Sequence, residues 1–525
     1  MHQIRTAPTG TISGVLGRRL AKMIAGIALV LFANAAAVAA PQGTLTWGIH
    51  LSLTSRFFDP GETPGTGAPL LLQYAQHDAL VRPVAGKSFG LSLAESMSQS
   101  ADGLTYEFKL RRGLKFQNGD PLTAEDVKFS FDRYRGAGAT LFKEKVAAVE
   151  VVDPITVRYR MKKPWPDFMT FFGTTATGAG WVLPKKYLER VGDDEFKKAP
   201  IGAGPYKLVS FKPGTEFVFE ASEHYWRKAP NVKTLVFKVI PDATTRLAAI
   251  KRGEIDFTYG VQGELAAEVL RTPHLKLKPA SIPVTNFIVF ASQYEKASPW
   301  SDARVRLAAN LALDRKAINQ AAYLGMAYES HSLIPHAMQY YWAPPAYPYD
   351  VARAKKLLAE AGHPNGFDGG DLSTDASDVM AESVQAYLGA AGIRMQLRPT
   401  ERAAHLKRTA EKKLTGLVFT GSGSPGSAAT RLEQFVRSTG TLSYIHDDDL
   451  DKLIEEQSLE IDAVKRKAKI DRIQQLVHER VRFLPVMEFA FPIVIGPRVG
   501  YDGVNGIPDN PYTGPYEDLT ILPGK

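Results

Sequence analysis

The chain has 525 residues, 44% of them hydrophobic and 23% charged, so its composition is that of a globular protein and excludes extended disorder. A chain of this length exceeds what one hydrophobic core usually serves, and two or three lobes are therefore expected. The net charge of +9 falls to +5 without the first 39 residues, which contain four basic residues and no acid. This mild excess, without a basic run, argues against a nucleic-acid partner.

The first 39 residues have the features of an export signal. A basic region ends at Lys22, an apolar run covers Met23–Phe32, and small residues lead to Ala39, after which we predict cleavage. The apolar run is too short to favour a membrane-spanning helix, which needs about 20 residues. Arg18-Arg19 leaves the twin-arginine route open, but no Phe-Leu-Lys follows, so the general secretory route is favoured.

The sequence contains no cysteine, which excludes disulfides, thiol nucleophiles and thiolate metal sites. It also excludes a lipid anchor on a cysteine just after the signal. We therefore expect a monomeric protein that is free in the periplasm. No later stretch is apolar enough and long enough to span a membrane.

The mature chain should begin with a strand over 43–49, followed by Phe57-Phe58-Asp59-Pro60 and a loop rich in Gly and Pro. Paired aromatic residues beside Gly and Pro are common in ligand pockets and commoner in cores. Both interpretations of Phe57 and Phe58 stay open at this point. Trp181 lies among small residues that allow close backbone approach, and packing or ligand contact could explain it.

The segment 102–134 predicts a strand, a turn and a capped helix. Leu104, Tyr106, Phe108 and Leu110 alternate with polar residues, as in a half-buried strand. Asn118-Gly119-Asp120-Pro121 has turn chemistry, and Thr123 with Asp126 resembles a capping box at the start of the helix.

Further helices are predicted over 242–253, 302–325, 350–362 and 378–391, each with apolar residues on one face. The first of these, between strands near 235–239 and 255–257, indicates a parallel α/β unit. A last amphipathic helix contains Ile470, Ile473 and Val477. Its basic cluster, Lys465, Arg466, Lys467 and Lys469, is interpreted as solvated surface.

Several of these segments resemble the peptide/nickel-type extracellular solute-binding proteins of family 5, the ligand-capturing components of ATP-driven importers. The resemblance is carried by His77-Asp78-Ala79-Leu80-Val81-Arg82-Pro83, by 102–134, by Pro200–Leu208, by "IPDATTRLAAIKRGEID" and by "YDVARAKKLLAEAGHPNGF". It implies the type II periplasmic-binding-protein fold, with two α/β lobes joined by a hinge and one inserted lobe. On this pattern residues 40–75, 203–285 and 490–525 form lobe I, 76–202 the inserted lobe II and 286–489 lobe III.

The loop Gly421–Gly426 formally matches a dinucleotide fingerprint, but Pro425 lies inside it and no acidic strand end follows. The family resemblance instead places this loop at the ligand cleft. In dipeptide-binding members of the family, an Asp for the amino group of the peptide stands where this chain has Ser424. Those members also have an Arg for the peptide carboxylate, and this chain has no Arg between Phe367 and Glu382. Because burying a charged end without a partner is costly, simple dipeptides are doubtful ligands.

The resemblance implies a solute carrier that performs no bond chemistry. Nickel or haem carriage occurs in that family, but no residue pattern here indicates it, and we expect no cofactor or metal. The histidines, His331, His336 and His363 among them, show no metal-binding spacing. The expected partners are a small-molecule or oligopeptide ligand and an inner-membrane ABC permease. Two alternatives stay open: a periplasmic serine hydrolase that uses Ser422 or Ser424, and a peptide-binding chaperone or sensor co-receptor on the same fold.

The candidate ligand-binding residues are small polar or aromatic side chains in the loops and strand ends that the family pattern assigns to the cleft. They are Phe57, Phe58, Trp181, Asn286, Tyr341, Trp342, Ser373, Ser422 and Ser424.

Overall fold

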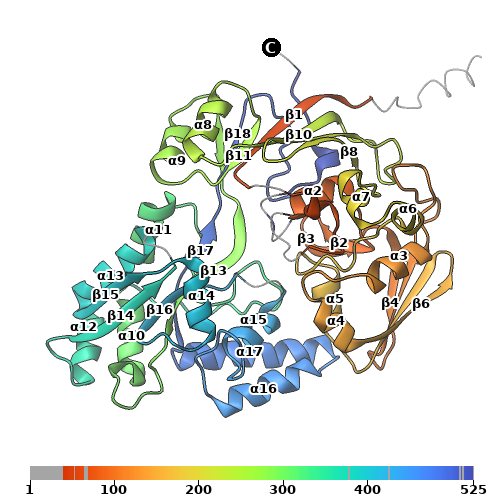
Figure 1. Ribbon diagram of the computed structural model, residues 1–525. Coiled ribbons are helices and arrows are strands. Elements are labelled where there is room, and N and C mark those ends of the chain that lie inside the picture. The colour runs from red at the N-terminus through yellow and green to blue at the C-terminus, as the bar shows by residue number, and fades with distance from the viewer. Residues whose placement is uncertain are drawn as a thin grey trace, which may run out of the picture. The chain divides into compact units, whose positions relative to one another are not determined.

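The computed structural model describes residues 40–51, 54–63, 69–375, 379–423, 426–507, 510 and 513–523. The predicted export signal lies outside these residues, as does Ser424. Within the described part, the strands form one seven-stranded, one five-stranded, one four-stranded and one two-stranded sheet. We name the lobes after the three larger sheets (Figure 1).

The first lobe is built on the seven-stranded sheet, in which β1 pairs in parallel with both β10 and β11. Its strands, in spatial order, are β12 (Lys276–Lys278), β18 (Ile493–Ile495), β11 (Phe257–Tyr259), β1 (Gln42–Ile49), β10 (Val232–Val239), β9 (Glu216–Ala221) and β8 (Tyr206–Lys212). Its helices are α2 (Pro69–Gln76), α8 (Ala243–Lys251) and α9 (Gly263–Leu270). The predicted parallel unit is confirmed, with β1 lying between its two strands.

The second lobe contains the antiparallel sheet β4 (Ala94–Gln99), β5 (Thr105–Leu110), β7 (Thr156–Met161) and β6 (Val146–Asp153). The hairpin β2 (Val81–Val84) and β3 (Lys87–Leu91) precedes it. Its helices are α3 (Ala124–Asp132), α4 (Ala139–Lys145), α5 (Phe168–Phe172), α6 (Lys185–Val191) and α7 (Asp193–Lys198). The predicted capping box is present at the start of α3, where Asp126 accepts a hydrogen bond from the Thr123 amide at 2.9 Å.

The third lobe contains the sheet β15 (Ile393–Pro399), β14 (Phe367–Thr374), β16 (Leu417–Gly421), β13 (Ser281–Phe290) and β17 (Phe483–Ala490). Along β13, Ile288 and Phe290 face one core, whereas Phe287 and Val289 face another. One core includes α10 (Ala303–Leu311), α11 (Arg315–Tyr323), α12 (Val351–Glu360) and α13 (Val379–Ala391), and the other includes α15 (Ala428–Phe435), α16 (Asp448–Ser458) and α17 (Ala463–Glu479) (Figure 1). Helix α14 (Arg402–Ala410) follows β15.

The single helix predicted over 302–325 is wrong, because the structure has two helices there. Helix α10 ends at Leu311 and α11 begins at Arg315. The Asp314 carboxylate accepts a hydrogen bond from the Ala317 amide at 2.9 Å, so it caps the second helix. A capping Asp inside an apolar stripe starts a new helix even when the periodicity continues.

The chain passes from the first to the third lobe between β12 and β13 and returns between β17 and β18. Strands β13 and β17 pair in the third lobe as far as Ser281 and Ala490, and β12 and β18 pair in the first lobe from Lys278 and Ile493. Between these ladders the Phe491 amide donates to the Ala280 carbonyl at 2.7 Å. The two crossing segments therefore stay hydrogen-bonded to each other. No helix in the described part of the chain is long and apolar enough to cross a membrane.

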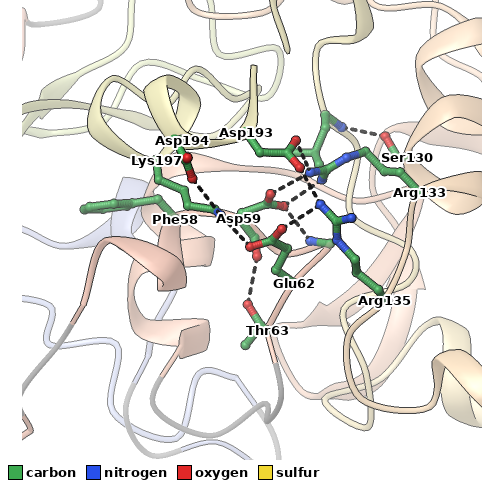
Figure 2. Close-up of polar contacts among 12 residues, drawn as sticks. Phe58, Asp59, Glu62, Thr63, Ser130, Arg133, Arg135, Asp193, Asp194 and Lys197 are labelled. Carbon is green, nitrogen blue, oxygen red and sulfur yellow. Dashed lines mark hydrogen bonds and ion pairs between the residues drawn. The ribbon is translucent and has the colours of Figure 1, made fainter. Parts of the chain in front are cut away.

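A buried ion pair joins the first lobe to the second. Asp59 is fully buried, and its two carboxylate oxygens each accept a hydrogen bond from the Arg133 guanidinium at 2.9 Å. Arg133 also donates to Asp193 at 2.9 Å, while Glu62 binds Lys197 at 2.7 Å (Figure 2). These contacts hold the loop after Phe58 against the end of α3 and the start of α7.

Replacement of Asp59 by Asn should lower the free energy of unfolding by about 2 kcal/mol, because Arg133 would lose its two charge-assisted bonds to a fully buried carboxylate and keep only Asp193. Urea unfolding followed by circular dichroism measures the change. The matched control is Asp132→Asn, which breaks an exposed pair with Lys128 on the same helix and should cost less than about 1 kcal/mol. Equal effects of the two substitutions would contradict a structural role for Asp59.

Candidate functional site

A cavity of about 800 Å³ opens between the second and third lobes. Ligand pockets in proteins typically measure about 300–1,000 Å³, so this space can hold a solute of several residues or one cofactor-sized molecule. The second lobe contributes residues from α4 and from the segment that leads into α5. The third lobe contributes one face of α15, the loop 439–441 and the C-terminal end of α16.

The third-lobe wall follows directly from the glycine-rich loop that the sequence analysis placed at a cleft. Helix α15 begins after that loop, with Ser427 and Thr430 forming a capping box. Thr430, Glu433 and Arg437 line the cavity, while Leu432 and Phe435 on the other face pack into the core. The amphipathic pattern of α15 thus turns its polar face toward the second lobe.

The second-lobe wall combines an aromatic surface with lysines. Trp165 and Phe171 stack with ring centroids 5.7 Å apart, and both line the cavity. Lys162 and Lys163 lie beside them and make no ion pair with any described residue, although the Lys162 ammonium donates to the Lys143 carbonyl at 2.8 Å. The wall is therefore apolar at its base and positively charged at its edge.

A carboxylate on the second-lobe wall is paired with a guanidinium of the third lobe. Asp167 lines the cavity from the second lobe, and its Oδ2 accepts a hydrogen bond from Arg466 Nη2 of α17 at 2.7 Å. The Arg466 side chain is 2% exposed. The interpretation of the whole basic cluster 465–469 as solvated surface is thus wrong for Arg466.

Three of the predicted site residues lie around the first lobe. Phe58 is fully buried and packs against Phe211 and Phe217, and Phe57 is partly buried against the same core. Trp181 is 5% exposed and meets Tyr74 edge to face at 5.3 Å. None of the three lines the cavity.

Three others lie on neighbouring strands of the third-lobe sheet. Asn286 on β13 pairs with Gly421 of β16, and Ser373 on β14 pairs with Val418 of β16. Ser422, directly after β16, is fully buried, and its hydroxyl accepts a hydrogen bond from the Thr285 amide at 2.9 Å. The structure therefore brings Asn286, Ser373 and Ser422 into one sheet, and Ser422 extends the β13–β16 pairing.

Tyr341 and Trp342 lie in the segment before α12 and are half-buried. The Trp342 amide donates to Gln474 of α17 at 3.2 Å, and the Trp342 ring meets His478 edge to face at 5.9 Å. Tyr341 packs against the core that α15 and α17 share. Neither residue borders the cavity between the lobes.

One further polar cluster lies three residues before the returning crossing segment. Glu488 is 2% exposed and accepts hydrogen bonds from the His336 amide at 2.7 Å and from the His336 ring at 2.9 Å. Burial raises the pKa of the Glu488 carboxyl, although His336 opposes that shift. The His336 ring stacks on Tyr328 at 4.0 Å, which covers the pair.

Sequence reasoning missed the residues of the cavity itself. The sequence analysis did not single out Lys163 or Trp165, and Asp167 and Arg466 are 299 positions apart. One signal for Arg466 was available in the sequence. It lies four and seven positions before Ile470 and Ile473, so a helix places it on the same face as these buried residues. Among the described residues, no group of three or more His, Asp or Glu side chains is arranged to hold a metal ion.

Comparison with known proteins gives a consistent result. The model of the family described as bacterial extracellular solute-binding proteins, family 5, middle, matches residues 89–443. Heme-binding protein A of Haemophilus influenzae is 29% identical over 459 residues, which cover 79% of this chain and 83% of that protein. Glutathione-binding protein GsiB of Salmonella choleraesuis is 30% identical over 391 residues, covering 69% of this chain and 75% of that protein.

A solved structure supports the same fold. The ABC transporter substrate-binding protein CtaP from Listeria monocytogenes superposes with a TM-score of 0.79 at 24% sequence identity. The alignment covers 92% of this chain and 99% of that chain. At this identity the likeness establishes the fold alone.

Replacement of Ser422 by Ala should lower the free energy of unfolding by about 1–3 kcal/mol, because the buried Thr285 amide would lose its acceptor. The same measurement on Ser383→Ala, whose exposed hydroxyl donates to the Val379 carbonyl within α13, should show a change below about 0.5 kcal/mol. A serine-directed phosphonate should not label the native protein. Labelling that Ser422→Ala abolishes would support the hydrolase alternative and contradict a structural serine.

Proposed function

Because this chain belongs to family 5 of the bacterial extracellular solute-binding proteins, we propose that it captures a small polar or anionic solute, peptide-like compounds included, in the cavity between its second and third lobes. The cavity of about 800 Å³, lined by residues of both lobes, is the observation that carries this proposal. Its walls come from parts of the chain that can separate only if the lobes move, so a solute inside it contacts both.

The chain is the solute-binding component of an importer, and its fold is the predicted type II periplasmic-binding-protein fold. A solute that contacts both walls stabilises the closed arrangement by the difference between its affinities for the closed and open forms. Closure then presents a different surface to the permease. Proteins of this family bind solutes without transforming them, and we propose that this chain also acts as a carrier.

The charges of the cavity support an anionic solute. The acids on its walls are paired within the protein: Asp167 with Arg466, Glu433 with Arg437, and Glu144 with Lys145. Lys162 and Lys163 have no carboxylate partner among the described residues, so a bound anion could accept charge-assisted hydrogen bonds from their ammonium groups. Trp165 and Phe171 offer an apolar surface for the body of the solute.

The names of the relatives are compatible with this class. Heme and glutathione both carry carboxylates attached to a larger body, which is the combination that lysines beside stacked aromatic rings suit. We propose that the mature protein is free in the periplasm and acts as a monomer with an ABC permease. The family is described as extracellular, which supports a location outside the cytoplasm.

Native mass spectrometry of protein purified from its own periplasm tests the proposed function. We expect a co-purified small molecule whose mass is lost after partial unfolding and dialysis, because a solute held between two lobes dissociates slowly. Protein that consistently carries no small molecule, and whose removal from the cell changes uptake of no solute, would contradict a carrier role.

Dialanine should show no micromolar binding in calorimetry. The chain has Ser424 where dipeptide-binding members have an Asp for the peptide amino group, and no Arg lies between Phe367 and Glu382 for its carboxylate. Burying either charged end without a partner costs more than the short peptide gains. Micromolar binding would show that other residues hold the two ends.

Replacement of Lys163 by Gln should weaken the binding of a recovered anionic solute by about fivefold, because one exposed charge contact is lost. Calorimetry with that solute measures the change. Lys355→Gln on α12 of the third lobe removes an equal charge outside the cavity and should leave affinity unchanged. Equal loss in both variants would indicate an effect of net charge and contradict a contact at Lys163.

A further inference from the structure

The ion pair between Asp167 and Arg466 joins two lobes that are otherwise built on separate sheets. Asp167 immediately precedes α5 of the second lobe, and Arg466 lies in the first turns of α17 of the third lobe. Arg466 Nη2 lies 2.7 Å from Asp167 Oδ2, and the two side chains are 2% and 13% exposed. Both charges are thus largely removed from water where the lobes meet.

Arg466 is held in position by its own lobe. Its Nε donates to the Gln457 carbonyl and to Gln457 Oε1, each at 3.2 Å, and Nη2 donates to the same Oε1 at 3.1 Å. The guanidinium also lies 5.5 Å from the centre of the Tyr340 ring. These contacts all come from the third lobe, so the guanidinium is preorganised and remains there if the lobes separate.

Asp167 belongs to the second lobe and is not used by its own helix. Its side chain makes no capping hydrogen bond to α5, and its Oδ1 has no hydrogen-bond partner among the described residues. The contact to Arg466 is therefore the interaction that holds the carboxylate. Asp167 and Gln457 both line the cavity, so the pair lies at the edge of the proposed solute site.

A second contact occurs at the same interface. The segment between α16 and α17 approaches the second lobe at Gly103, where a Cβ atom would lie 3.1 Å from Ile461 Cγ2 and 3.4 Å from Pro164 Cβ. Gly103 has a φ of +69°, so the turn also favours glycine. The absence of a side chain at Gly103 lets Ile461 approach the lobe that contains Asp167.

We propose that Asp167 and Arg466 form a latch that holds the second and third lobes together before any solute binds. Separation of the lobes would return both charges to water, whereas contact desolvates them and replaces that water with one direct ion pair. The two states are then close in free energy, and a modest force can open the latch. If the protein captures a solute as proposed above, its apparent affinity for that solute is proportional to the fraction of molecules that are closed, so the latch raises the affinity.

The absence of native cysteines makes the latch measurable without any solute. Val152 of β6 and Leu406 of α14 are both exposed, so Val152→Cys and Leu406→Cys can each carry a spin label. Double electron–electron resonance then measures the distance between the second and third lobes. We expect one main short-distance population in the otherwise unchanged protein. Asp167→Asn should raise the ratio of separated to closed molecules by about tenfold, because Arg466 would then be desolvated against a neutral partner.

A matched control and a rescue variant separate the latch from general damage. The control Glu107→Gln breaks an ion pair that lies wholly within the second lobe, in which Arg158 Nη2 is 2.7 Å from Glu107 Oε2. This variant should leave the distance distribution unchanged. The double variant Asp167→Leu with Arg466→Met removes both charges and should return the closed population to within about twofold of the parent, because no desolvation cost remains.

Each outcome decides the proposal. A distance distribution for Asp167→Asn that matches the parent would overturn the latch, as would an equal opening of the lobes in the control Glu107→Gln. A fall in melting temperature of Asp167→Asn without a change in distance would assign the pair to stability alone. Failure to recover a solute would contradict the proposed function and would leave the distance result unaffected.

Discussion

The backbone pairing of the two crossing segments is the constraint on which the other features of the molecule depend. Residues 279–280 leave the first lobe and residues 491–492 return to it, and the Phe491 amide donates to the Ala280 carbonyl where they lie side by side. Two paired strands resist being pulled apart but can bend and twist together. Motion between the lobes is thereby restricted to a hinge, and the contacts at the far edge decide which position of the hinge is favoured.

Buried charge pairs have two different roles around that hinge. Asp59 has both carboxylate oxygens bound by Arg133, and the adjacent Asp193, Glu62 and Lys197 extend the network. Breaking it would remove both bonds between Arg133 and a fully buried carboxylate, so it fixes the first lobe to the second. Asp167 instead has a single bond to Arg466, on the opposite side of the cavity, and this bond can open without disturbing either lobe's core.

The cavity borders the second of these contacts, because Asp167 is part of its lining. Its second-lobe wall moves with the first lobe, because the Asp59 network joins them, while its third-lobe wall moves with α15 and α17. A solute that contacts both Lys163 and the face of α15 would therefore favour the same closed position of the second and third lobes as the latch does. Binding and closure are linked in this arrangement because they stabilise the same relative position of the lobes.

The packing of Ser422 also explains why this residue is a poor candidate for chemistry. Ser422 is fully buried, and its hydroxyl is already an acceptor for the Thr285 amide. A nucleophilic serine needs a free hydroxyl and a base within hydrogen-bond reach. The strand end instead uses the hydroxyl to complete a ladder, which makes the edge of the sheet rigid beside the glycine-rich loop.

The sequence by itself determined the local elements and, through its motifs, the family. The alternation before Leu110, the capping box of Thr123 and Asp126, and the helices predicted to start at residues 242 and 350 depend on residues within a few positions of one another, and all appear as predicted. Only the tertiary structure decided which polar residues meet across lobes. Arg466 follows the pattern of a solvated helix face, yet it is buried because Asp167, 299 positions earlier, lies opposite it. Phe58 could have faced a solute or a core, and the packing of the seven-stranded sheet placed it in the core. Such pairings depend on how separately folded lobes come together, and no short-range pattern in the chain encodes that.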